Sequence, residues 1–264
     1  MLIGFLYAGI ILLACILGAI VGLGGGVFIR PIFDAMGYST VHNISFLSST
    51  AILTMAIVST YAKVKTGLEI DYKKAALISG GAILGGVIGN VLLEHLIYNV
   101  FFDAQYRVQQ AQIIMTVIIL ALSLVFTHLN YLRYEIKNQL AFTPIGIVLG
   151  FCAVFMGIGG GPINVPLFMI LFGLPIKKAT AYSIVIIFFS HLSAIISILA
   201  TATAEYPLDY HMLIYVIPAA ALGGVIGAKF SNVFSSKIVK RLFMASIMAV
   251  ILLNIFNGLF VISA

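Results

Sequence analysis

The sequence predicts an all-α polytopic membrane protein with two inverted-topology repeats, eight long transmembrane helices and two short half-helices. Three observations support this fold class. First, 62% of the 264 residues are hydrophobic and 8% are charged, with a mean hydropathy of +1.18. A soluble domain has about 25% charged residues. Second, a glycine-rich motif occurs once in each half of the chain, and third, the lysines and arginines gather in short loops.

Apolar runs define the long helices, because crossing a bilayer takes about 20 consecutive apolar residues. We expect these helices, in chain order, at 2–22, 44–62, 74–93, 109–129, 140–158, 179–200, 210–228 and 238–262. Two further apolar pieces, 27–36 and 162–172, follow the glycine motifs and are too short to cross unaided. We therefore predict that they are half-helices.

The two halves of the chain repeat three blocks of sequence in the same order. The matched pairs are 22–33 with 157–168, 70–72 with 208–210, and 85–89 with 223–227. Three matches in one order indicate two copies of a single membrane unit. We therefore divide the chain into a first repeat at 1–129, a connecting loop at 130–138 and a second repeat at 139–264.

The positions of the lysines and arginines predict the orientation of the two copies in the membrane. If only the long runs cross, six loop lysines and arginines lie on each side, against the positive-inside rule. If each half-helix instead returns the chain to the side it came from, each repeat has five passes and all twelve charges share one face. Five is odd, so the second repeat is inverted. The loop at 130–138 is then cytoplasmic, and both termini lie on the non-cytoplasmic side of the membrane.

The glycine triplets interrupt the chain at membrane depth. Irregular backbone there is tolerated where protein or a water-filled cavity covers it, and glycine lets a ligand approach closely. The half-helix that follows starts with unpaired N–H groups, which favour an anion. Two inverted copies would direct two such ends into one cavity. The predicted substrate-binding glycines are Gly24, Gly25, Gly26, Gly159, Gly160 and Gly161. Close helix packing is the alternative, and it is the preferred explanation for the later glycine rows at 81–89 and 223–227.

Arg30 lies in the half-helix after the first triplet. An arginine inside a membrane costs about 2.5 kcal/mol or more. Next to the positive end of a helix it is poorly placed to stabilise that helix, which indicates an anion nearby. A pair with Asp34 at i,i+4 and snorkelling to the surface are the alternatives. The matched position in the second copy is Val165, with Asn164 beside it. The predicted site thus combines one charge with one amide.

The helices after the half-helices carry polar residues at membrane depth. Ser48 and Ser183 occupy the same position in the two repeats, which makes them candidate substrate ligands. His191 lies in the middle of its predicted helix, and His42 lies just before another. The unperturbed pKa of histidine, about 6.5, suits a proton relay. A neutral, hydrogen-bonded histidine between helices is the alternative explanation.

The doubled pattern G-x-G-G-G-x-x-x-x-P, followed by a short apolar piece, a turn and a Ser/Thr-rich helix, resembles the sulfite exporter family, also called TauE/SafE. The residues that carry this resemblance are Gly22, Gly24, Gly25, Gly26 and Pro31, then Gly157, Gly159, Gly160, Gly161 and Pro166. The resemblance covers essentially the whole chain. It implies movement of small sulfur oxyanions, such as sulfite, organosulfonates or thiosulfate, across the bacterial inner membrane, mostly outward.

We therefore expect a secondary transporter of small sulfur-containing anions, with proton coupling as a further hypothesis. A carrier or channel for another small anion, such as a carboxylate, is the alternative. We do not expect an enzyme, because Ser190 and His191 are adjacent and project about 100° apart on a helix, and neither a metal-ligand nor a nucleotide-binding motif is present. The expected partners are the anion and the lipid bilayer, with no cofactor, metal or nucleic acid. A homodimer is left open.

Overall fold

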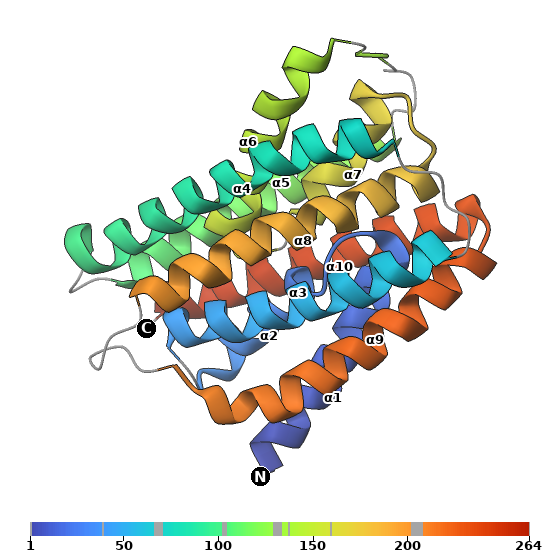
Figure 1. Cartoon of the computed structure of the whole chain (residues 1–264). Helices are drawn as coiled ribbons and strands as arrows, with labels where there is room; N and C mark the ends of the chain where they lie inside the picture. The colour runs from blue at the N-terminus through green and yellow to red at the C-terminus, as the bar shows by residue number, and fades with distance from the viewer. Residues whose placement is uncertain are drawn as a thin grey trace.

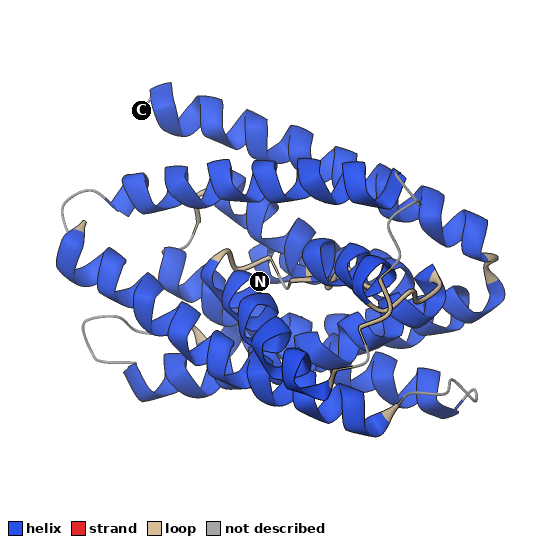
Figure 2. Cartoon of the chain, turned by 90° about the horizontal axis from the view of Figure 1, so that it is seen from above, coloured by secondary structure: helices blue, strands red, loops and turns tan. Residues whose placement is uncertain are grey.

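The computed structural model describes the whole chain except Met1, Ser39, 66–70, 102–104, 129–133, Lys137, Gly159, 202–207 and Ala264. Its helices are α1 (Leu2–Val21), α2 (Gly26–Met36), α3 (Val41–Lys65), α4 (Tyr72–His95), α5 (Gln105–His128), α6 (Phe142–Phe155), α7 (Gly161–Leu171), α8 (Ile176–Thr201), α9 (Leu213–Val233) and α10 (Ser236–Ser263). Short helical turns at Leu96–Val100, Gln139–Ala141 and Tyr210–Met212 adjoin α4, α6 and α9. The described residues form no strand, as Figure 2 shows. The predicted all-α membrane fold is confirmed.

Within the described residues, seven helices are long and apolar enough to cross a membrane: α1, α3, α4, α5, α8, α9 and α10. The remaining predicted long helix, at 140–158, is shorter than expected. With its leading turn, α6 covers Gln139–Phe155, which is 17 residues. It ends before the predicted boundary at residue 158 because Gly157 has a φ of +64°, a left-handed conformation that interrupts the helix. The half-helices α2 and α7 follow the two glycine motifs as expected.

The two halves of the chain are interlocked. Helix α1 packs along α9, and α4 packs along α6, so the first long helix of each half lies against the third long helix of the other. Helices α3 and α8 contact each other and lie between these pairs, as Figure 1 shows. The same helix of each half takes the same place in these pairs, as expected for two copies of one unit. The inverted orientation of the copies in a membrane stays a prediction.

The glycine rows in α4 and α9 are packing surfaces. A Cβ on Gly85 would collide with the backbone of Ile147 in α6, and one on Gly223 would lie 2.8 Å from the carbonyl oxygen of Leu12 in α1. Glycine permits such close approach of two helix backbones in membranes. The packing explanation for these rows is confirmed, and they are separate from the triplets at the helix breaks.

Candidate functional site

Both glycine motifs form tight turns between a long helix and a half-helix. Gly22 and Gly24 have φ values of 73° and 75°, and Gly157 and Gly160 have values of 64° and 69°. These left-handed conformations are readily accessible to glycine alone. We call residues 22–26 the first break and residues 157–161 the second break. The predicted ligand Gly159 lies outside the described residues.

The two breaks touch each other inside the protein. A Cβ on Gly161 would collide with the backbone of Leu23, and one on Gly26 would lie 3.4 Å from the carbonyl oxygen of Gly157. Each half-helix therefore begins beside the break of the other copy. The two glycine motifs begin 135 residues apart in the sequence, at Gly22 and Gly157, and they meet in the folded structure.

The first break is closed by side chains from three neighbouring helices. The last carbonyls of a helix have no intrahelical partner and need donors from elsewhere. Three side chains donate to these carbonyls. Lys63 Nζ donates to Ala19 O (3.1 Å), Ser231 Oγ to Ile20 O (3.1 Å) and Ser183 Oγ to Gly22 O (2.6 Å). The end of α1 is therefore well satisfied by the protein itself.

The second break is stabilised by the side chain of Gln112, which also binds Arg30. Gln112 of α5 donates from Nε2 to the carbonyl oxygen of Phe155, the last residue of α6, at 2.6 Å. Its Oε1 accepts a hydrogen bond from Arg30 Nη2, also at 2.6 Å. The guanidinium packs so closely on Gly157 that a Cβ there would collide with Arg30 Nη1. The arginine of the first copy thus reaches the break of the second.

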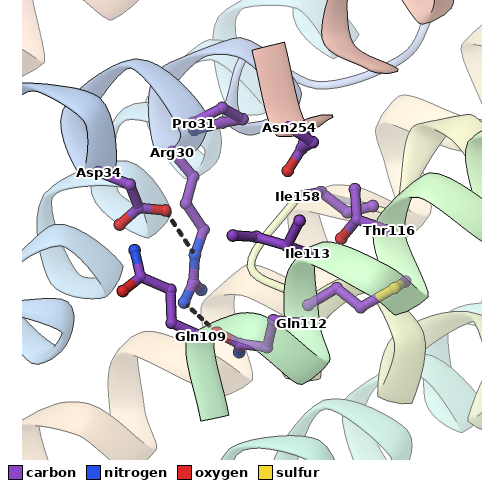
Figure 3. Close-up of a pocket in the computed structure, with 10 residues that line it drawn as sticks. Arg30, Pro31, Asp34, Gln109, Gln112, Ile113, Thr116, Ile158 and Asn254 are labelled. Atoms are coloured by element: carbon purple, nitrogen blue, oxygen red, sulfur yellow. Dashed lines mark hydrogen bonds and ion pairs between the residues drawn. The ribbon is translucent and has the colours of Figure 1, made fainter. Parts of the chain in front are cut away.

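Arg30 is buried, with 4% of its surface exposed, so snorkelling to the surface is excluded. Figure 3 shows its guanidinium between Asp34 and Gln112. Arg30 Nε lies 3.8 Å from Asp34 Oδ2, which is an ion pair but longer than a hydrogen bond. Within the described part of the chain, Nη1 has no hydrogen-bond partner. The arginine therefore pairs loosely with Asp34 and keeps one N–H group available.

A cavity adjoins Arg30 between α2, α5 and α10. Its volume of about 10 Å³ is enough for one water molecule. Met156 and Ile158, on either side of Gly157, form its wall at the second break. Its polar lining is Arg30, Asp34, Gln109, Gln112, Thr116 and Asn254. An anion larger than water needs the surrounding helices to move apart.

Four of these lining residues were absent from the predicted site: Gln109, Gln112, Thr116 and Asn254. The sequence did contain a signal for three of them. Gln109, Gln112 and Thr116 recur at i, i+3 and i+7, which is the period of one helix face, in a segment whose only other polar residue is Gln110. A polar face within a transmembrane helix indicates the protein interior.

Asn164 provides a second polar group that lacks a partner. It lies in the first turn of α7 and is fully buried, at 0% exposed. Neither Nδ2 nor Oδ1 has a hydrogen-bond partner among the described residues. Gly160 lies nearby, since a Cβ there would be 3.4 Å from Asn164 Nδ2. An unsatisfied buried amide costs about 1–3 kcal/mol, so its presence at a helix start points to a ligand.

The two candidate serines differ in their surroundings. Ser183 donates to Gly22 O and so closes the first break, whereas Ser48 donates to Ser45 O in its own helix at 3.3 Å. Neither serine lines the cavity beside Arg30. The equivalent sequence positions therefore have different structural roles.

The two candidate histidines also lie apart from that cavity. His191 is buried in α8, and its Nδ1 is 3.3 Å from Ser49 Oγ of α3. This contact is a hydrogen bond between helices, as in the alternative explanation that the sequence left open. His42 lies in the first turn of α3 and is half-buried. The role of both histidines in proton transfer stays a prediction.

A family model described as Sulfite exporter TauE/SafE matches residues 7–254. The chain belongs to the TauE/SafE sulfite exporter family. The matched segment contains both breaks and every polar residue that lines the Arg30 cavity, from Arg30 to Asn254. The TauE/SafE assignment therefore applies to the whole candidate site.

Relatives of this TauE/SafE chain are named as membrane transporters. It is 27% identical to the probable membrane transporter protein YunE of Bacillus subtilis, over 94% of this chain and 96% of the relative. A probable membrane transporter protein of Methanocaldococcus jannaschii is 25% identical, over 82% and 83%. MamO of Paramagnetospirillum magneticum is 27% identical over 41% of this chain and 18% of its own. No solved structure matches. The protein is a multi-pass membrane transporter and not an enzyme.

Proposed function

We propose that this TauE/SafE protein is a secondary transporter, working as an exporter, for small sulfur-containing anions such as sulfite, organosulfonates or thiosulfate. The membrane is a bacterial inner membrane, with both termini periplasmic and the loop at 130–138 cytoplasmic. The substrate binds where the two breaks meet. One observation carries the proposal: Arg30 is buried against the second break with its Nη1 group unpartnered.

The site offers three kinds of donor to an oxyanion. The guanidinium supplies charge and a planar set of N–H groups that matches several oxygens at once. The first N–H groups of α2 and α7 add the positive ends of two helices. The amide of Asn164 adds a neutral donor that has no partner among the described residues. Burial strengthens each of these interactions, because the interior screens charge less than water does.

Transport requires the site to open to one side at a time. The cavity beside Arg30 holds about one water molecule, so the structure corresponds to a closed arrangement around the site. The two interlocked helix pairs, α1 with α9 and α4 with α6, can rock against each other about the touching breaks. Each moving unit then contains helices of both repeats, 1–129 and 139–264. The enclosed cavity favours a carrier over an open channel.

A carrier for another small anion, such as a carboxylate, is the alternative, because guanidinium and amide groups bind carboxylates equally well. Binding and transport together separate the two. We would measure the unfolding temperature of the purified protein with sulfite, thiosulfate, sulfoacetate, sulfate, chloride and acetate. A ligand present at about 100 times its Kd stabilises the folded state by about 2.7 kcal/mol.

Arg30→Ala and Arg107→Ala form a matched pair for this screen, because Arg107 is an exposed arginine on α5, outside the cavity lining. We expect one sulfur anion to stabilise the wild type and Arg107→Ala but not Arg30→Ala. The same anion should exchange across proteoliposomes that contain either of the first two proteins. Normal exchange by folded Arg30→Ala would contradict the proposed site, and stabilisation by acetate alone would favour the carboxylate alternative.

A further inference from the structure

Asp34 is the one acidic residue on the half-helix that carries Arg30. It lies one turn further along α2, and its side chain is 10% exposed. Figure 3 shows its carboxylate beside the guanidinium, on the side opposite Gln112. The 3.8 Å separation from Arg30 Nε is too long for a direct hydrogen bond. Arg30 can therefore leave Asp34 and pair with another anionic group.

The surroundings of Asp34 contain few other charges. The cavity lining that faces it from α5 and α10 consists of the neutral side chains Gln109, Gln112, Thr116 and Asn254. Helix α1 contributes the ionisable group Tyr7, which stacks on Phe33 of α2 with ring centroids 4.1 Å apart. Helix α3 contributes His42 in its first turn. Arg30 is the charged group that acts on Asp34 most directly.

An anion that enters this site disturbs its charge balance. Arg30 and Asp34 together are neutral, so an added anion leaves a net negative charge in a buried place. Two like charges this close together repel strongly in the protein interior, which screens charge less than water does. A proton on the Asp34 carboxylate removes this repulsion and frees the guanidinium for the anion.

We propose that Asp34 is a proton-binding site through which this transporter moves a proton together with its anion. This inference rests on the proposed function and adds the coupling ion to it. It assigns coupling to the cavity itself, whereas His191 and its contact Ser49 lie on α8 and α3, outside the cavity lining.

The cycle balances in charge and protons. On the loading side the anion binds the guanidinium of Arg30, and the Asp34 carboxylate takes one proton from water. The site then opens to the other side with a neutral carboxyl group. The anion leaves, the carboxyl group releases its proton to water, and Asp34 pairs with Arg30 again. One proton and one anion have crossed in the same direction. This is electroneutral for a monovalent anion and moves one net negative charge for a divalent one, and net export proceeds when the outward anion gradient exceeds the inward proton gradient.

The test uses the full-length protein in proteoliposomes with thiosulfate, which carries no proton at neutral pH, and sulfite as the second probe. The variants are Asp34→Asn, which cannot release a proton, and Asp34→Glu, which keeps an ionisable group. Two quantities are measured: exchange of labelled anion at equal pH, and accumulation driven by an acidic exterior. A trapped pH dye reports the proton that enters with the anion.

We expect the wild type to accumulate the anion and to acidify the lumen as it does so. Asp34→Asn should lose accumulation and acidification while part of the exchange remains, and Asp34→Glu should restore accumulation. Wild-type accumulation of the anion without any acidification, or wild-type exchange without any accumulation under an acidic exterior, would overturn the inference and leave the proposed function intact; this result does not depend on how the variants fold. Accumulation by Asp34→Asn at the wild-type level, or equal loss of exchange and accumulation in folded Asp34→Asn, would also overturn it. Absence of exchange in the wild type would instead overturn the proposed function, and the inference with it.

Discussion

The two glycine breaks share a sequence motif but have different environments. At the first break, side chains of α3, α8 and α9 satisfy the carbonyls at the end of α1. At the second break, Gln112 binds the end of α6 and also binds Arg30, whose Nη1 has no partner in the described structure. The same sequence motif is therefore structural in one copy and a candidate binding site in the other.

Two of the sequence differences between the half-helices explain this contrast. The first half-helix has Ile29 and Arg30 where the second has Asn164 and Val165. Because the breaks touch, a long side chain from α2 reaches the second break, with its guanidinium against Gly157. One pair of substitutions thus places a charge and an unpaired amide around the second break. An internal repeat can become asymmetric in chemistry while its sequence motif is kept.

The largest expected effect comes from separating the two breaks. In Gly161→Ala the new Cβ would collide with the backbone of Leu23, which cannot move aside as a flexible side chain can. We expect loss of folded, monodisperse protein, measured by size-exclusion chromatography in detergent. Gly80→Ala is the control, because a Cβ there meets nothing within 4 Å and alanine is favoured over glycine in a helix by about 1 kcal/mol. A well-folded Gly161→Ala protein would show that the breaks do not touch.

A smaller effect is expected when only the second break loses its support. Gln112→Leu removes the donor to Phe155 O and the acceptor for Arg30 Nη2. A buried polar group left without its partner costs about 1–3 kcal/mol. We expect a lower free energy of unfolding and weaker stabilisation by the sulfur anion. Gln109→Leu changes the same face of α5 and should have a smaller effect on both. Equal effects of the two variants would show that Gln112 does not orient the arginine.

The sequence predicted the parts of this site that depend on local pattern. Hydropathy located the helices, the glycine triplets located both breaks, and the cost of a buried charge identified Arg30. It did not predict Gln112, which lies 82 residues from Arg30 and meets it only through packing of α5 against the broken helices. The serines show the same limit, because equal repeat positions gave Ser183 and Ser48 different partners. These differences arise from tertiary contacts, which the two copies of a repeat do not have to share.

Asn164→Leu separates binding from stability at the second break. The amide has no partner in the described protein, so replacing it with an apolar side chain of similar size removes a desolvation cost of about 1–3 kcal/mol. We expect an unchanged or higher unfolding temperature together with weaker anion binding and slower exchange. Ile29→Leu, at the matched position of the first break, is the control and should leave anion binding as it is. A large drop in stability of Asn164→Leu would show that the amide has a structural partner.

The smallest expected effect compares the two serines directly. Ser183→Ala removes a 2.6 Å hydrogen bond that closes the first break at Gly22 O, so we expect a loss of about 1 kcal/mol in the free energy of unfolding. Ser48→Ala removes a 3.3 Å hydrogen bond to Ser45 O within α3, and hydroxyl groups of this kind contribute little to a helix. Denaturant unfolding of both variants beside the wild type measures the difference. A loss in Ser48→Ala as large as that in Ser183→Ala would mean that Ser48 supports the second break, and the two breaks would then be more alike than their hydrogen bonds indicate.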